Sequence, residues 1–351
     1  MSEQVASKES ATAEPNAPQP GRGKVQAIAN AIEPRPKSIA CPPESVNWYL
    51  TPICNYRCGF CFFTVKGYEE LKPLSTGMFM QPDLARTLLA RLRDSGTKKV
   101  TFVGGEPTLV PALPTLVRWT YELGMTPMIV SNGTGLTDAL LDKLVLYLTD
   151  PIRPGAIKLS LDSGREDVEQ NLGRGRGDHL ARLKKRARAI HARRIPLMVN
   201  IVVTSKTWRE DMHNILRELQ PIARLKILQV LPIDGQNDHA WESLKVTAEQ
   251  FRSFCERHSN LGVVVEDNDT MTESYVMVDP LGRFFQNTGR KYHYSRPILD
   301  VGVIPALSDV GWDREKFVGR GGRYHVESQN QLGGQLPRLE IVRPLRKEVD
   351  P

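Results

Sequence analysis

The stretch C-N-Y-R-C-G-F-C, residues Cys54 to Cys61, contains three of the five cysteines of this 351-residue chain. Thiolates are soft ligands that suit zinc, copper(I) or iron–sulfur clusters. A closed structural zinc site takes four ligands, usually as two pairs, and a [4Fe–4S] cluster also takes four. No second pair is present, because Cys41 lies in a proline-rich segment and Cys255 lies far downstream. Three thiolates would leave one metal position open for another ligand.

The cysteines directly follow a short apolar segment, and similar segments recur along the chain. The six strand candidates are Val46–Leu50, Lys99–Val103, Pro127–Ser131, Ile157–Leu161, Leu197–Val203 and Leu225–Leu231. Helical patterns fall between them at Pro82–Arg93, Leu113–Leu123, Thr137–Tyr147, His179–Arg194 and Trp208–Leu219, and another follows at Thr247–His258. Strands that alternate with helices indicate a parallel sheet with right-handed crossovers. Six units are too few for a closed eight-stranded barrel, so we predict an α/β fold with a partial (β/α)6 barrel.

The chain divides into four predicted regions. Residues 1–44 are rich in Pro, Ala, Ser, Gln and Glu and are expected to form a disordered arm. Residues 45–245 form the partial barrel. Residues 246–325 form a C-terminal extension of short irregular segments that closes the site, and residues 326–351 form a disordered tail.

Composition narrows the possible location and partners. The formal net charge of +7 favours an anionic partner, either nucleic acid or a phosphorylated small molecule. No apolar run reaches about 18 residues, so no membrane-spanning helix is expected. The polar N-terminus lacks the apolar core of a signal peptide, and the crowded thiols suit a reducing compartment. We therefore expect a cytoplasmic protein with no membrane partner.

Polar motifs follow the next three strands, at the edge where the active site of an α/β sheet lies. They are V-G-G-E-P at Val103–Pro107, S-N-G-T at Ser131–Thr134 and S-L-D-S at Ser160–Ser163. Two glycines let the backbone approach a ligand closely, and a carboxylate matches an ammonium group. Two alternatives stay open, because S-N-G-T is also a common turn and Asp162 could cap the next helix.

The segment L-G-R-G-R-G, Leu172 to Gly177, joins glycines to two arginines. Such a loop can bind an anion, although it is also found as a solvated turn. The next helix carries a basic face between Arg182 and Arg188, which we interpret as a solvated surface. No aromatic residues alternate with these charges, so a nucleic-acid partner is not expected.

The spacing C-x3-C-x2-C, with Phe60 before the last cysteine, resembles the radical S-adenosylmethionine (SAM) superfamily. The resemblance implies a [4Fe–4S] cluster on Cys54, Cys58 and Cys61, with SAM on the open iron. An electron from the cluster would then cleave SAM to a 5′-deoxyadenosyl radical. The positions that match SAM-binding residues of the superfamily are Tyr56, Phe60, Gly104, Gly105, Glu106, Ser131, Asn132, Ser160 and Arg174.

Longer stretches between Ser45 and Tyr324 resemble the viperin family within that superfamily. They include S-V-N-W-Y-L-T-P-I-C-N-Y-R-C-G-F-C-F-F-T, N-L-G-R-G-R-G, L-K-I-L-Q-V-L-P-I-D-G, E-D-N-D-T-M-T-E-S-Y and G-R-G-G-R-Y. The resemblance implies that the radical takes the ribose 4′ hydrogen of a nucleoside triphosphate and the 3′ hydroxyl leaves as water. The product would be a 3′-deoxy-3′,4′-didehydro nucleotide, a chain terminator with antiviral action. CTP is the first candidate for the substrate, and UTP and GTP stay open. The amphipathic N-terminal helix of animal members is not found, so we expect a prokaryotic or archaeal member.

The same resemblance implies a set of substrate residues. Tyr275 matches a tyrosine proposed as a hydrogen donor, and it is our candidate catalytic residue. The candidate substrate-binding residues are Asn47, Asn200, Arg224, Lys226, Gln229, Arg320 and Arg323. Simpler interpretations stay open, since Lys226 could extend from a strand edge and Tyr275 could belong to the core. Asn200 interrupts an apolar strand, and a polar residue there needs a partner.

One position departs from the family pattern. Animal members carry a phosphate-binding lysine two residues before the asparagine of the fifth strand, where this chain has Met198. Methionine cannot pair with a phosphate. Either another cation such as Lys206 or Arg174 supplies the charge, or the nucleotide is held differently.

Two other functions compete with nucleotide dehydration. A radical SAM maturase acting on a peptide or RNA is the runner-up, although such enzymes often carry further cysteine-rich domains. A non-enzymatic iron–sulfur or zinc scaffold is the third hypothesis. For the preferred function we expect a reductase or ferredoxin-type electron donor and a monomeric protein.

Overall fold

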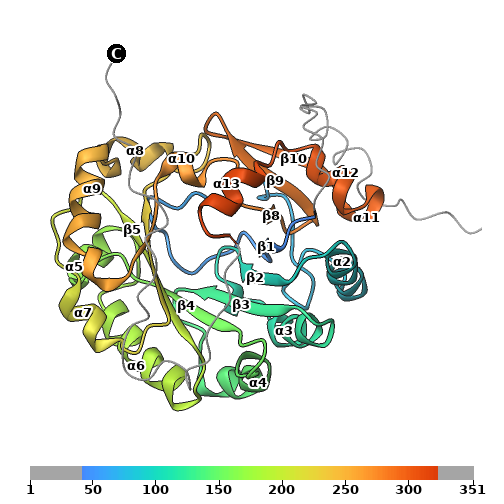
Figure 1. Cartoon of the computed structure of the whole chain (residues 1–351), viewed down its shortest axis with the longest axis horizontal. Coiled ribbons are helices and arrows are strands. Elements are labelled where there is room, and N and C mark those ends of the chain that lie inside the picture. The colour runs from blue at the N-terminus through green and yellow to red at the C-terminus, as the bar shows by residue number, and fades with distance from the viewer. Residues whose placement is uncertain (1–41, 323–351) are drawn as a thin grey trace, which may run out of the picture.

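The computed structural model describes residues 42–322. The predicted tail at 326–351, and all but residues 42–44 of the predicted arm, lie outside this range. The described chain forms a single sheet of ten strands in the order β10-β9-β8-β1-β2-β3-β4-β5-β6-β7. In Figure 1 the sheet curves through the centre of the molecule and helices surround it.

Six strands run parallel in chain order and form the predicted partial barrel. They are β1 (Ser45–Tyr49), β2 (Lys99–Val103), β3 (Thr126–Ser131), β4 (Ala156–Ser160), β5 (Leu197–Val203) and β6 (Arg224–Gln229). Each bound lies within two residues of the prediction. The described sheet does not close into a ring, which confirms the open barrel.

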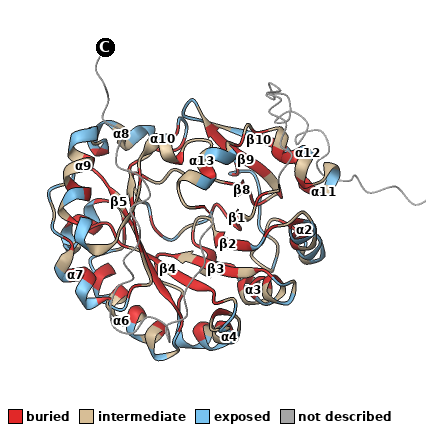
Figure 2. Ribbon diagram, viewed as in Figure 1, coloured by how far each residue is buried: buried red, intermediate tan, exposed pale blue. Residues whose placement is uncertain are grey.

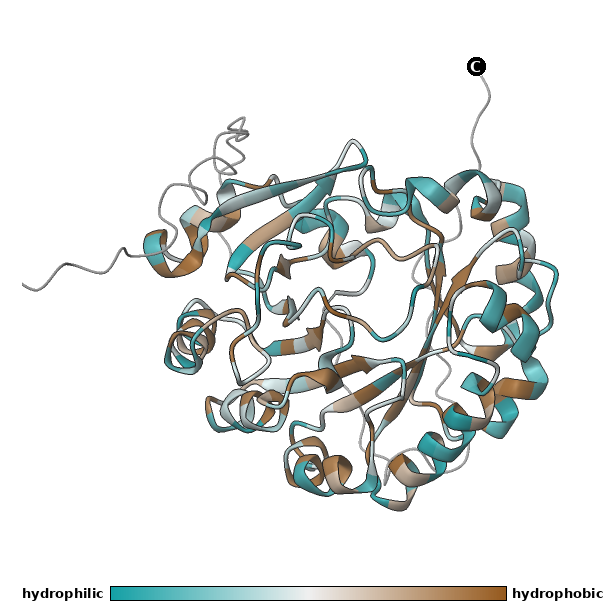
Figure 3. Cartoon of the chain, turned by 180° about the vertical axis from the view of Figure 1, so that it is seen from behind, coloured by the Kyte–Doolittle hydropathy of each residue, from teal (hydrophilic) through white to brown (hydrophobic). Residues whose placement is uncertain are grey.

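The helices between these strands cover the outer face of the sheet. They are α2 (Pro82–Asp94), α3 (Leu113–Glu122), α4 (Asp138–Leu148), α5 (Glu166–Asn171), α6 (His179–Ala192) and α7 (His213–Glu218), with a short 3-10 turn, η2 (Pro107–Leu109), after β2. Figure 2 shows buried positions facing the strands and exposed positions on the opposite side. Figure 3, seen from behind, shows the same division by hydropathy.

Helix α2 illustrates why these segments fold as they do. Pro82 stands at its start, where a missing N–H costs nothing, and Asp83 complements the positive end of the helix dipole. Its buried residues are Ala85, Leu88, Leu89 and Leu92. This spacing places them on one stripe, which packs on the sheet.

The strands present two different faces. On β4, Ile157 and Leu159 are fully buried in the main core beneath the helices. Because successive side chains of a strand point to opposite faces, Lys158 and Ser160 point into the barrel. The interior of the barrel is therefore polar where it passes β4.

The predicted helix at Trp208–Leu219 is shorter in the structure, where α7 begins only at His213. Glu210 accepts hydrogen bonds from the Ser163 hydroxyl at 2.7 Å and from the Gly164 N–H at 3.0 Å. Arg257 also donates to the Trp208 carbonyl at 3.0 Å. These long-range bonds hold residues before His213 as a loop, so the first part of the helix prediction was wrong.

The helix predicted at Thr247–His258 is confirmed as α9 (Ala248–Arg257), but the expectation of irregular segments beyond it was wrong, because that region supplies four strands. Strand β7 (Val264–Glu266) pairs with β6, and β8 (Met277–Val278) pairs with β1, both in parallel. Strands β9 (Arg283–Thr288) and β10 (Lys291–Pro297) form an antiparallel hairpin beside β8. The hairpin turn places Gly289 and Arg290 at positive φ, and Gly-Arg is a weak sequence signal for such a turn.

Short helices complete this part of the chain. They are α8 (Asp238–Leu244), α9 (Ala248–Arg257), the 3-10 turn η3 (Ser259–Leu261), α10 (Asn268–Met271), α11 (Ile298–Val301), α12 (Val303–Ser308) and α13 (Arg314–Gly319). Since strands from this region extend both edges of one sheet, the boundary near residue 245 stays a prediction. None of the helices between residues 42 and 322 has the length and apolar character needed to cross a membrane.

Candidate active site

The three clustered cysteines lie in the loop that follows β1, at the carboxyl edge of the sheet. The Cys61 N–H donates to the Cys58 carbonyl at 3.0 Å, which folds the second half of the loop into a turn. Burial raises the pKa of Cys58 to about 12 and that of Cys61 to about 11, and the charge of Cys54 adds to both shifts. The three cysteines are half-buried and their charges interact, and a metal cation would favour their thiolate forms.

Two glycines let neighbouring loops press against the cysteine loop. A Cβ on Gly105 would lie 2.1 Å from the Ile53 carbonyl oxygen, and one on Gly173 would lie 2.1 Å from the Arg57 carbonyl oxygen. The Arg57 N–H donates to the Gly173 carbonyl at 3.1 Å. Backbone from the β2 and β4 ends thus shapes the loop directly, and no side chain larger than hydrogen fits at either contact.

The carboxylate of Glu106 joins two of the predicted motifs. It is almost fully buried and accepts hydrogen bonds from the Ser131 hydroxyl at 2.7 Å and the Asn132 N–H at 2.8 Å. The Asn132 amide in turn donates to Asn55 at 2.9 Å, beside Cys54. Burial raises the pKa of Glu106, and its hydrogen bonds oppose that rise. The G-G-E-P and S-N-G-T motifs therefore meet next to the cysteines.

Arg174 is buried and paired, whereas Arg176 and Gly177 of the same L-G-R-G-R-G segment are exposed. Its guanidinium lies 2.5 Å from the Asp162 carboxylate and 3.6 Å from that of Glu169, and 5.5 Å from the centre of the Phe60 ring. Asp162 also accepts from the Val202 N–H at 2.8 Å and is thus no helix cap. Because two carboxylates already engage Arg174, this arginine is a poor replacement for a phosphate-binding lysine.

Tyr56 takes part in a network that includes residues absent from the predicted set. Its hydroxyl lies 3.2 Å from Nδ1 of His179 and accepts from Arg182 at 2.6 Å. Burial lowers the pKa of His179 to about 3, so the imidazole is neutral. Its Nε2 lies 3.0 Å from the Ser160 carbonyl, which indicates that Nε2 carries the proton. His179 and Arg182 were not predicted as site residues, because both lie on helix α6 and no sequence motif marks them.

A second cluster gathers two predicted substrate-binding residues, Lys226 and Arg320, and the candidate catalytic residue Tyr275 around Glu266, which was not predicted. Lys226 Nζ lies 2.5 Å from the Glu266 carboxylate and 3.1 Å from the Tyr275 hydroxyl. Arg320 lies 3.5 Å from Glu266 and stacks 3.7 Å from the centre of the Tyr275 ring. Tyr275 also donates to Glu266. Although burial opposes it, the charges of Lys226 and Arg320 lower the pKa of Glu266 to about 2.

The other predicted substrate residues lie along the same interior. Asn200 stands between Ser160 on β4 and Lys226 on β6 in the sheet register. Asn47 pairs in register with Thr101 on β2 and Met277 on β8. Two further predicted residues lie on β6, namely Arg224 and Gln229, and Arg323 lies outside the described residues. The structure thus brings Ser160, Asn200 and Lys226 side by side on β4, β5 and β6, whereas Asn47 lies on β1. The role of each residue stays a prediction.

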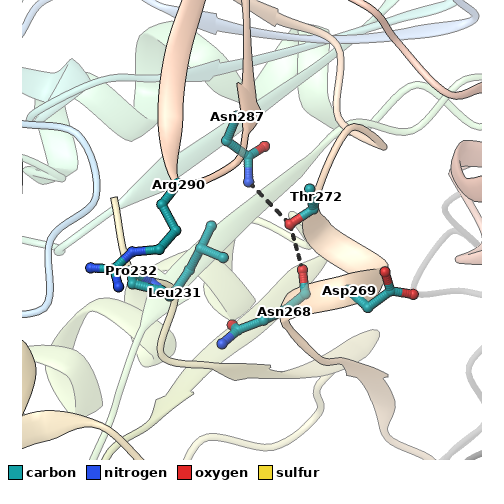
Figure 4. Close-up of a pocket in the computed structure, with 7 residues that line it drawn as sticks. All are labelled: Leu231, Pro232, Asn268, Asp269, Thr272, Asn287 and Arg290. Atoms are coloured by element: carbon teal, nitrogen blue, oxygen red, sulfur yellow. Dashed lines mark hydrogen bonds between the residues drawn. The ribbon is translucent and has the colours of Figure 1, made fainter. Parts of the chain in front are cut away.

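A pocket of ≈ 220 Å³ lies beyond the carboxyl end of β6 (Figure 4). Its lining residues are Leu231, Pro232, Asn268, Asp269, Thr272, Asn287 and Arg290. None of them was predicted, although the Asn268 N–H donates to the predicted Gln229 at 3.1 Å. In Figure 4 Asn287 and Thr272 point toward each other across the pocket. Its position places it at the mouth of the barrel and not at the cysteine loop.

A second group of metal-ligating side chains lies elsewhere, at Asp211, His213 and His258. Nε2 of His258 accepts from the Met212 N–H at 2.9 Å, and its Nδ1 lies 2.8 Å from the Phe254 carbonyl. Both ring nitrogens are therefore engaged by backbone groups. We interpret this group as a structural contact and the cysteine loop as the candidate cofactor site.

Comparisons with known proteins agree with this geometry. Residues 48–219 match the radical SAM superfamily. Among solved structures, Streptococcus suis SuiB bound to S-adenosylmethionine aligns with a TM-score of 0.55 and 16% identity, covering 80% of this chain and 67% of that one. This likeness shows the shared fold. The site and the fold therefore define a radical SAM enzyme.

Closer relatives specify the family. The chain is 36% identical to an S-adenosylmethionine-dependent nucleotide dehydratase of Flammeovirga pacifica, over 80% of this chain and 95% of that protein. It is 38% identical to a protein of the same name from Lacinutrix mariniflava, and spans 58% of that longer relative. The chain belongs to the family of S-adenosylmethionine-dependent nucleotide dehydratases.

Membership implies a [4Fe–4S] cluster and SAM as cofactors. The residues present fit this pair, because three half-buried thiols lie in one loop and glycines let neighbouring backbone approach that loop. Beside them lies a buried carboxylate, Glu106, whose charge suits an ammonium group. A closed structural zinc site takes four ligands, usually as two pairs, and the one further cysteine of the described residues, Cys255, lies on α9.

Proposed function

We propose that this protein dehydrates a nucleoside triphosphate to its 3′-deoxy-3′,4′-didehydro form. The observation that carries the proposal is the pair of clusters within one barrel. Three thiols gather at the end of β1, and a buried group of cations around Glu266 includes Lys226 and Arg320. The first suits a radical-generating cofactor and the second suits a phosphorylated substrate.

Cofactor binding is assigned to the loops at the carboxyl ends of β1 to β4. Cys54, Cys58 and Cys61 would hold the cluster, which together with SAM would supply the radical that removes the ribose 4′ hydrogen. Glu106 would accept hydrogen bonds from the SAM amine, and the bonds that Ser131 and Asn132 donate to its carboxylate support this role by orienting it. Tyr56, Phe60, Gly104, Gly105, Ser160 and Arg174 complete the proposed cofactor-binding set.

Substrate binding is assigned to the barrel interior. Arg224, Lys226 and Arg320 would bind the phosphates, because guanidinium and ammonium groups form charge-assisted hydrogen bonds to them. Asn47 and Asn200 would contact the nucleoside, and Gln229 and Arg323 complete the proposed set. A closed and dry interior would protect a radical from side reactions.

Tyr275 is the proposed catalytic residue: it would donate a hydrogen atom, as a proton and an electron, to the substrate radical when the 3′ hydroxyl leaves as water. The proposed electron donor would then reduce the tyrosyl radical, which would take up a proton. Burial and the negative charge of Glu266 raise its pKa well above the ordinary value, so its hydroxyl keeps its hydrogen. The bonds to Glu266 and Lys226 fix the position of that hydroxyl. CTP is the proposed substrate, with UTP and GTP as the next candidates.

The electron is proposed to come from a reductase or ferredoxin-type donor. We also infer a cytoplasmic location and a monomeric state. The location is supported by four free cysteines, Cys54, Cys58, Cys61 and Cys255, because thiols persist in a reducing compartment.

The test is a product assay on anaerobically reconstituted protein. SAM, dithionite and CTP, UTP or GTP are added in turn, and 5′-deoxyadenosine and dehydrated nucleotide are measured by mass spectrometry. We expect one triphosphate to stimulate both products. Cys58→Ala should abolish them, whereas the control Cys255→Ala, a buried cysteine of α9, should not. Deoxyadenosine formation that no triphosphate stimulates would contradict the proposal and favour a maturase.

A further inference from the structure

Met198 raises the question of which cation replaces the lysine expected at this position. In the sheet register Met198 on β5 pairs with Lys158 on β4 and with Arg224 on β6. The next layer of inward-facing side chains lies two residues closer to the carboxyl end of each strand. It contains Ser160, Asn200 and Lys226. A lysine that is missing from β5 is therefore present on the neighbouring strand, in the same layer of the barrel.

The direction of Lys158 follows from its neighbours in sequence. Ile157 and Leu159 are fully buried in the core beneath the helices, so the residue between them points into the barrel. Met198 is only 3% exposed and packs with Met128 and Ala156 in a small apolar cluster. Met198 thus lies in register with Lys158 and Arg224 and also contacts the apolar side chains at the start of β4.

The charges around Lys158 favour an anion. Lys158 interacts electrostatically with Arg224, Arg320 and Glu266, and Glu266 is already bonded to Lys226. Lys158 therefore lies near Arg224 and Arg320, two of the side chains proposed to bind the phosphates. Burial first, and then the charges of Arg224 and Arg320, lower the pKa of Lys158 to about 7. A phosphate that binds among basic side chains forms charge-assisted hydrogen bonds with them.

The alternative cations do not lie in this layer. Lys206 is exposed in the turn that follows β5, near the carboxyl edge of the sheet. Arg174 is held by the carboxylates of Asp162 and Glu169. Neither shares the layer of Met198.

We propose that Lys158 binds the phosphate end of the substrate, so that β4 supplies the charge that β5 lacks at Met198. The inference rests on the proposed function, in which the substrate is a nucleoside triphosphate. It adds one residue to the substrate site and explains how this chain tolerates methionine at position 198. Since a bound polyanion favours the charged ammonium, binding would also be accompanied by uptake of a proton.

The decisive experiment moves the lysine from position 158 on β4 to position 198 on β5 and measures nucleotide affinity. Affinities of the reconstituted protein for CTP, UTP and GTP are measured by calorimetry with no reductant present, so that no turnover occurs. We expect Lys158→Met to weaken binding of the preferred triphosphate by roughly 10- to 100-fold, the scale of one lost charge-assisted hydrogen bond. The double variant Lys158→Met with Met198→Lys should recover most of that loss, because the lysine returns to the same layer.

Two further measurements separate binding from folding. Lys206→Met is the matched control, and its affinity should equal that of the wild type. A melting temperature of Lys158→Met close to that of the wild type would show that weaker binding does not come from a loss of folding. Calorimetry in two buffers of different ionisation enthalpy should show proton uptake for the wild type and less for Lys158→Met.

The outcomes also distinguish this inference from the proposed function. Unchanged affinity in Lys158→Met, or a well-folded double variant that recovers nothing, would overturn the inference while nucleotide binding by the wild type still stands. A wild-type protein that binds none of the three triphosphates would overturn both. Weakened binding in the single variant and recovery in the double variant would support the inference.

Discussion

The two halves of the barrel interior are built from different kinds of contact. At the cysteine loop, backbone meets backbone, with Gly105 and Gly173 leaving no room for a side chain. Around Glu266, by contrast, long charged side chains from β6 and α13 reach a common carboxylate. The first half is defined by shape and the second by a balance of charge.

This difference determines how each half responds to sequence change. A Cβ added at Gly105 or Gly173 would lie less than about 3 Å from neighbouring backbone, so a loop would have to move. Substitutions there are therefore expected to disrupt the site. In a cluster of charged side chains, the total charge and the length of the side chains matter more than the exact position of each residue. Lys158 beside Met198 is an example, because a cation on a neighbouring strand faces the same layer.

The largest effect is expected for Gly173→Ala. Its φ of +85° is unfavourable for alanine, and the new Cβ would lie 2.1 Å from the Arg57 carbonyl oxygen. The cysteine loop must then shift, and we expect cluster assembly to fail and product formation to fall by at least about a hundredfold, the scale of displaced active-site geometry. Iron content per protein after reconstitution, together with product yield, measures this effect.

Gly164→Ala is the matched control for that glycine. Its added Cβ would lie 3.5 Å from Ile215, an ordinary contact, and it follows the same strand as Gly173. Normal iron content in this variant would show that the loss of cluster in Gly173→Ala comes from the contact between Gly173 and the cysteine loop. Normal iron content in Gly173→Ala as well would show that the loop contact does not shape the cluster site.

Tyr275→Phe should have the next largest effect, on the other half of the interior. The ring stays in place beneath Arg320, but the hydroxyl that bonds to Lys226 and Glu266 is lost. We expect deoxyadenosine to form while dehydrated nucleotide falls by roughly a hundredfold, the scale for removing a positioned transfer group. The ratio of the two products by mass spectrometry is the measurement.

Tyr147→Phe, on the outer helix α4, is the control and should leave that ratio unchanged. If Tyr275→Phe also leaves the ratio unchanged, Tyr275 acts through packing and not as a hydrogen donor. A parallel fall of both products would instead indicate a role in binding, because substrate triggers SAM cleavage under the proposed function.

The fold and the cofactor half were largely predictable from sequence. Alternation of apolar segments predicted the six parallel strands, since burial beneath helices selects long apolar side chains at every second position. The cysteine spacing and G-G-E-P lie within single loops, so their members are adjacent in sequence as well as in space. Local motifs therefore predicted Glu106 and Asn132 beside Cys54, as the structure shows.

The substrate half was less predictable because its partners are distant in sequence. Glu266 meets Lys226 across 40 residues, and it lies on β7, a strand of three residues that was expected to be irregular. Lys158 had a signal that was overlooked, because a lysine within A-I-K-L-S interrupts an apolar strand as Asn200 does. Such residues need a partner inside the barrel, and only the register shows which one.

The smallest expected effect concerns His179, which links the helix α6 to Tyr56 and Ser160. Burial lowers its pKa to about 3 in the folded protein, below the ordinary value of 6.5. The unfolded chain therefore takes up a proton first as the pH falls. The stability that comes from the neutral imidazole is complete above pH 6.5 and is lost progressively toward pH 3. Between pH 7.5 and 5.5, the wild type should lose about 1 kcal/mol more of its unfolding free energy than His179→Gln does.

The control His213→Gln should change the pH dependence in the opposite direction, because hydrogen bonds to Asn260 and Asp211 raise the pKa of His213. Urea unfolding of the reconstituted protein at both pH values measures these differences, and equal losses in wild type and His179→Gln would show that His179 is protonated in the folded state.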